Sequence, residues 1–152
     1  MAIALGFHLL AAALWVGGLF FAYMILRPTL QAVDSPGLRL QIWLGVFGRF
    51  FPWVWVAIVA LYASGFWMLL VGMGGGLATA RHGIHLMLST ASLMSLLFAY
   101  LYFMPYRQFK QAVRAENYPA AARFLGAIRQ IVAMNTVLGA ATLVVAAMTR
   151  YA

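Results

Sequence analysis

Four long runs of apolar residues divide the chain into candidate membrane spans. They cover residues 2–26, 50–71, 84–104 and 127–148. A helix needs about 20 mostly apolar residues to cross the hydrocarbon core of a bilayer, and each run reaches that length. The runs are too long for buried strands and lack the alternation of a membrane β-barrel. The sequence therefore predicts an all-α fold, an integral membrane up-down four-helix bundle that forms one transmembrane domain over residues 1–152.

The composition agrees with lipid as the solvent. Hydrophobic residues make up 66% of the chain and charged residues 8%, whereas about 25% of a soluble domain is charged. Lys and Arg outnumber the acids by ten to two. In a soluble protein this excess would indicate nucleic acid, but here membrane topology explains it, so we expect the bilayer and no nucleic acid as partner. The chain has no cysteine, which excludes disulfides, thiolate metal sites and iron–sulfur clusters.

The basic residues gather in two of the three links between the spans. The first and third links hold Arg27, Arg39, Arg49, Arg107, Lys110, Arg114 and Arg123. The second link offers only Arg81. The positive-inside rule then predicts cytoplasmic first and third links, with both termini in the periplasm of a bacterial inner membrane. The first run lacks the basic start of a signal peptide and is expected to stay as a span.

The links also carry helix start and stop signals. Ser35 and Pro36 form an N-cap and first-turn pair, which predicts a short interfacial helix ahead of the second span. After Pro105 the apolar spacing predicts an amphipathic continuation of the third helix. Asn117 is expected to end that helix and Pro119 to begin the fourth.

Histidine is the ionisable residue type that the spans offer for chemistry. Both acids, Asp34 and Glu116, lie in links, which argues against a carboxylate proton relay. His8 and His85 are expected at one depth near the outer face, with His82 closer to the water. The first and third helices of an up-down bundle are diagonal, about 12–14 Å apart, which suits a macrocycle between two imidazoles. The pattern predicts a b-type heme between His8 and His85 in electron transfer, which would allow a heme-dependent oxidoreductase.

Other residues could line such a heme site. Small side chains at Ser89 and Ser92 would leave room for a planar group, and Trp15 could pack along its ring. Arg129, just inside the fourth span, is the arginine expected to do more than fix topology. Ordinary helix packing in membranes uses the same small residues.

Two other functions remain open from the residues. Imidazole and thioether together form a plausible cuprous-copper set, which would combine His8, His82 and His85 with four outer methionines, although methionine is also common filler in apolar interiors. These methionines are Met68, Met73, Met87 and Met148. A small, apolar chain would also suit a homo-oligomer or a structural subunit of a larger membrane complex.

The chain resembles the CopD-like family of bacterial membrane proteins. The resemblance rests on three short motifs: His8, Trp15, Gly17, Gly18 and Leu19 through Arg27-Pro28; Gly48-Arg49-Phe50; and Arg129-Gln130 to Asn135. It implies a role in copper handling.

The chain is also similar, more distantly, to the four-helix HemJ family. That family implies heme binding and protoporphyrinogen oxidase activity, with histidines that His8 and His85 match. Met87 stands where HemJ proteins have a lysine, and no Asn-Glu-x-Pro surrounds Asn135. The resemblance therefore carries over the histidine pair and not the oxidase activity.

Overall fold

The computed structural model describes residues 1–72 and 82–151, and every regular element in these two ranges is a helix. The elements in chain order are α1 (Ala2–Phe20), the π-helical η1 (Phe21–Leu26), α2 (Arg27–Leu30), α3 (Pro36–Trp67), the π-helical η2 (Met68–Gly72), α4 (His82–Phe103), α5 (Pro105–Arg114) and α6 (Tyr118–Tyr151). The glycine-rich second link, with Met73 and Arg81, lies outside the described residues. The prediction of an all-α fold is confirmed.

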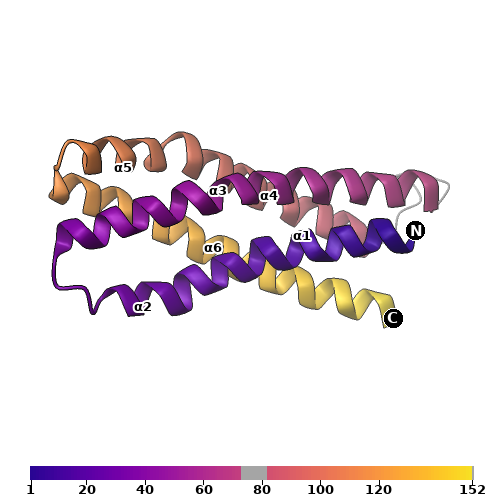
Figure 1. The fold of residues 1–152 in the computed structure, drawn as a ribbon. Helices are drawn as coiled ribbons and strands as arrows, with labels where there is room; N and C mark the ends of the chain where they lie inside the picture. The colour runs from indigo at the N-terminus through magenta and orange to yellow at the C-terminus, as the bar shows by residue number, and fades with distance from the viewer. Residues whose placement is uncertain (73–81, 152) are drawn as a thin grey trace.

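The helices join into four segments that are long and apolar enough to cross a membrane. These segments are Ala2–Leu30, Pro36–Val71, His82–Arg114 and Tyr118–Met148. Figure 1 shows them side by side, with the links 31–35 and 115–117 at one end and both termini at the other. We call these the basic end and the terminal end. The chain is therefore a four-helix membrane bundle, as the apolar runs predicted.

The helices extend beyond the apolar runs into the links. Ser35 caps α3, because its Oγ accepts a hydrogen bond from the Leu38 N–H at 3.3 Å. From there α3 is continuous through Pro52, so the predicted separate interfacial helix is instead the first part of the second span. Membrane helices tolerate an internal proline because neighbouring groups take up the freed carbonyl.

The third segment breaks where α4 meets α5. The backbone of Met104 takes φ −108° and ψ −86°, after which α5 turns its apolar face, including the fully buried Phe109, onto the bundle. Glu116 then adopts a left-handed φ of 53° that reverses the chain. The side-chain oxygen of Asn117 accepts a hydrogen bond from the Ala120 N–H at 3.2 Å, which is an N-cap interaction at the start of α6. The predicted amphipathic continuation after Pro105 is confirmed.

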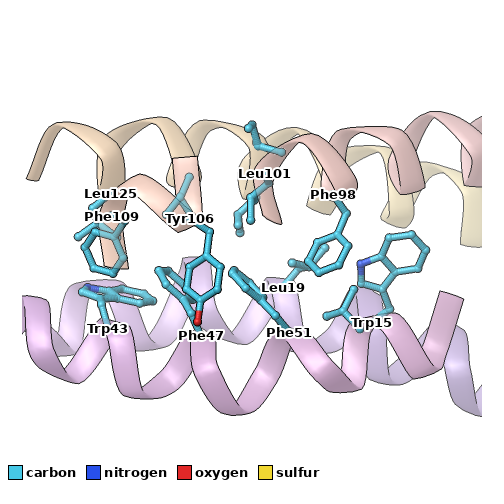
Figure 2. Close-up of a cluster of buried hydrophobic side chains, with 14 of the residues drawn as sticks. Trp15, Leu19, Trp43, Phe47, Phe51, Phe98, Leu101, Tyr106, Phe109 and Leu125 are labelled. Atoms are coloured by element: carbon cyan, nitrogen blue, oxygen red, sulfur yellow. The ribbon is translucent and has the colours of Figure 1, made fainter. Parts of the chain in front are cut away.

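A cluster of aromatic side chains fills the half of the bundle toward the basic end (Figure 2). Phe51 lies at its centre, with its ring centroid 4.9 Å from Phe47, 4.8 Å from Tyr106 and 5.4 Å from Phe98. Phe109 contacts Phe47 from α5, 6.0 Å away. Helices α3, α4 and α5 are thus joined by edge-to-face and stacked rings, the arrangements that aromatic pairs prefer.

Toward the terminal end the helices meet through small and polar side chains. Tyr62 of α3 donates a hydrogen bond to Ser92 of α4 at 3.1 Å, and Thr142 of α6 donates to Thr90 of α4 at 2.9 Å. Helix α1 packs on α3 and α6. The helices therefore follow one another around the bundle as α1, α3, α4 and α6, which puts α1 and α4 on a diagonal.

Candidate functional site

His8 of α1 faces α3 and has a hydrogen-bond partner there. Its Nδ1 lies 2.9 Å from Oγ of Ser64. The single Ser64 hydroxyl hydrogen is directed to the Ala60 carbonyl oxygen, 2.5 Å away, so Ser64 Oγ accepts the bond and His8 Nδ1 donates it. Gly65 lies beside the ring, where a Cβ would be 3.4 Å from His8 Cε1, an ordinary van der Waals distance.

This arrangement leaves one lone pair on the His8 ring. A neutral imidazole that donates from Nδ1 keeps the Nε2 lone pair free. Metal-binding histidines commonly use the same pattern, with an outer partner that fixes the tautomer and the ring orientation. Because His8 is half-buried and Ser64 is buried, the ring is held within the bundle near the terminal end. His8 is thus suited to bind a metal through Nε2.

The depths of His8 and His85 in the bundle can be compared by counting residues from one level at which three helices meet. Gly139 of α6 lies against both Val16 of α1 and Met94 of α4. At about 1.5 Å per residue, His8 lies about 12 Å and His85 about 13.5 Å from that level toward the terminal end. The two histidines are therefore at similar depth.

Their surroundings differ. His8 turns to α3, whereas His85 and His82 are exposed on α4. The two serines that follow His85 on α4 already have hydrogen-bond partners. Ser89 donates to the backbone carbonyl oxygen of His85 at 2.8 Å, and Ser92 accepts from Tyr62. The axial pair of His8 and His85 therefore stays a prediction.

Trp15, the expected ring-packing residue, lies in the packed core. Only 2% of its surface is exposed, and its Nε1 has no hydrogen-bond partner in the described residues. Figure 2 shows the indole beside Phe98 and Leu19, at the end of the aromatic cluster. The structure therefore gives Trp15 a packing role.

The outer methionines are distributed over several helices. Met68 is half-buried and follows Ser64 by one turn of helix, since its N–H bonds back to the Ser64 and Gly65 carbonyl oxygens. Met87 of α4 is half-buried, and Met148 of α6 is 66% exposed. Residues 1–72 and 82–151 contain no group of three or more His, Cys, Asp or Glu that could hold a metal. A metal site here would therefore combine imidazole with thioether ligands.

At the basic end, Arg129 joins two arginines from other helices. Arg27, Arg39 and Arg129 line one cavity between the first span, α3 and α6. Arg49 lies apart from them, exposed, with its Nη1 donating to the Gly45 carbonyl oxygen at 3.2 Å.

The sequence reasoning missed Ser64 and the placement of Arg39. Ser64 is buried in a mostly apolar part of α3, and a serine in such a span is a signal that could have indicated a polar partner. Arg39 was read only as a charge in a link. Because Arg39 is four residues after the Ser35 cap, it could have been placed in the first turns of a helix.

The fold and the histidine–serine pair define a multi-pass membrane protein with a half-buried, hydrogen-bonded imidazole toward its terminal end. The family model of copper resistance protein D (CopD) matches residues 44–149, more than half of the chain. The chain therefore belongs to the CopD family. The match covers α4 and most of α3 and α6, whereas His8 lies before it. No curated protein and no solved structure matches the chain, and the relationship to HemJ stays a prediction.

Proposed function

We propose that the protein handles copper in the membrane by binding cuprous ion at the terminal end, with His8 Nε2 as one ligand. The observation that carries this proposal is the His8–Ser64 hydrogen bond of 2.9 Å, because a ring that donates from Nδ1 has its lone pair on Nε2, in a family named for copper resistance. Cuprous copper is soft and accepts imidazole and thioether ligands. Asp34 and Glu116 lie in links, so hard cations that need oxygen cages are disfavoured.

Met68 is the thioether that we assign to the same site. It lies one helical turn beyond Ser64, toward the terminal end and on the same side of the helix as the residue that holds His8. Its side chain is unbranched and half-buried, so it can change rotamer to meet an ion. Met87 of α4 and His85 are further candidates to complete the coordination.

We predict that replacing His8 with alanine weakens cuprous-ion binding by at least about tenfold. Removing a residue that only orients a metal ligand already lowers metal affinity by about this factor, and removing the ligand itself should lower it at least as much. Full-length protein in detergent is titrated with cuprous ion under reducing conditions against a chromogenic chelator. Ser64→Ala should also weaken binding, since the ring then loses its fixed tautomer, and Met68→Leu should weaken it by removing the thioether. The matched controls are His82→Ala and Met134→Leu, two exposed positions.

Three results would count against this proposal. The first is unchanged binding in His8→Ala, and the second is an equal loss in the His82→Ala control. The third is a Soret band in the purified protein that disappears in both His8→Ala and His85→Ala, which would establish the heme function instead. Partners that co-purify in mild detergent and no metal binding would favour the structural-subunit function.

The proposal places the copper site on the periplasmic side of a bacterial inner membrane. The charge asymmetry between the two ends supports this, because basic links stay in the cytoplasm. The chain has no cysteine, so single cysteines can report the topology. In intact spheroplasts, a membrane-impermeant maleimide should label Ala2→Cys and should label Ala115→Cys only after the membrane is opened. The reverse pattern would show the opposite orientation.

A further inference from the structure

A cavity of about 360 Å³ lies at the basic end, away from the proposed copper site. The first span, α3 and the start of α6 enclose it. Its polar lining comes from Arg27, Gln31, Arg39, Tyr118 and Arg129, and its apolar lining includes Trp43. Three arginines that are separated in sequence thus meet at one place.

The positive charge in this cavity has no acidic counterpart. Asp34 and Glu116, the two acids of the chain, are exposed and do not line it. The Nε atoms of Arg27 and Arg39 are buried and have no hydrogen-bond partner in the described residues. Three like charges held close together, with buried donors unpaired, are costly unless an anion is bound.

The remaining contacts of Arg27 and Arg39 hold them in place and leave donors free. Arg39 uses Nη2 to donate to the Val33 carbonyl oxygen at 2.7 Å. Arg27 places its guanidinium carbon 5.2 Å from the centre of the Tyr23 ring. Each guanidinium has five N–H donors in a planar fork, so most of the donors can still bind an anion.

We propose that this cavity binds a phosphate group, supplied by the headgroup of an anionic lipid. Converging guanidinium groups bind phosphate by paired, charge-assisted hydrogen bonds. The cavity lies at the end of the spanning helices, where headgroups are found, and basic pockets between membrane helices bind such headgroups. The apolar side chains of Leu40, Trp43 and Leu125 beside the arginines can contact the glycerol and the upper acyl chain. The site is independent of the copper function.

Native mass spectrometry of the full-length protein with phosphatidylglycerol tests the proposal, with phosphatidylcholine as the zwitterionic comparison. Wild-type protein should retain phosphatidylglycerol in preference. Arg39→Gln and Arg129→Gln should each weaken retention by about tenfold, the usual effect of losing a hydrogen bond to a charged group. Arg49→Gln is the matched control: it removes the same charge from α3 at the same end, but it lies outside the cavity.

A second variant tests the cavity without changing any charge. Ala122 lines it, and Ala122→Phe should fill it and reduce lipid retention while keeping every arginine. If an arginine variant aggregates, this variant decides the question. Thermal unfolding with inorganic phosphate identifies the source of the anion. Stabilisation of wild type but not of Ala122→Phe, without lipid preference, would support a phosphate site filled from solution. Equal lipid retention in all variants, or an equal loss in Arg49→Gln, would overturn the proposal.

Discussion

Replacing Phe51 with alanine is expected to lower the free energy of unfolding by about 3 kcal/mol, the low end of the range for replacing a buried phenylalanine with alanine. Phe51 is 1% exposed and packs against Phe47, Phe98 and Tyr106, so its removal leaves a cavity where three helices meet. The low end applies because the unfolded helices stay in lipid, where the lost term is packing rather than transfer from water.

Unfolding by sodium dodecyl sulfate in mixed micelles measures this effect. Val56→Ala is the control, since Val56 lies on the same helix with 56% of its surface exposed. It should change the unfolding free energy by less than about 0.5 kcal/mol. Similar losses in the two variants would mean that the aromatic cluster does not hold α3, α4 and α5 together.

Replacing Gly139 with leucine is expected to lower the free energy of unfolding by about 2 kcal/mol through overpacking. A Cβ at this position would lie 2.6 Å from Val16 Cγ2 and 3.1 Å from Met94 Cε. Val16 is β-branched and has little rotamer freedom, so α1 and α6 must move apart to admit a larger residue. Close helix approach at small residues is a main source of stability in membrane bundles.

The same unfolding experiment checks this prediction with Ala140→Leu as its control. Ala140 is the next residue on α6 and is exposed, so leucine there meets no neighbouring helix. Gly139→Ala should give a smaller loss than Gly139→Leu. If Gly139→Leu unfolds like wild type, the close contact between α1, α4 and α6 is not present in the membrane.

Much of the fold was predictable from sequence. Each span is longer and more apolar than a soluble element would need, and the cap at Ser35 and the proline at 105 mark helix starts by local chemistry. The continuity of α3 through Pro52 was not predictable, since proline ends helices in water but is accommodated within a membrane bundle.

The candidate site was only partly predictable. His8 was identified because imidazole is scarce and chemically distinct in an apolar span. Its partner, Ser64, was not identified, because the contact depends on which side of α1 faces which side of α3. In the same way, the sequence placed Arg27, Arg39 and Arg49 together among the link charges, whereas the structure joins Arg27 and Arg39 with Arg129 in the cavity and leaves Arg49 exposed.

The sequence by itself determined the number of spans, their approximate limits and which links carry the charge. These properties depend on length, hydropathy and local capping, which are read residue by residue. Only the tertiary structure decided which side of each helix faces the bundle, and therefore which residues meet at His8 and in the arginine cavity. The physical reason is that spans such as α1 are apolar on every side, so hydropathy does not distinguish the lipid-facing side from the packed one. That choice is made by side-chain shape and interhelical hydrogen bonds.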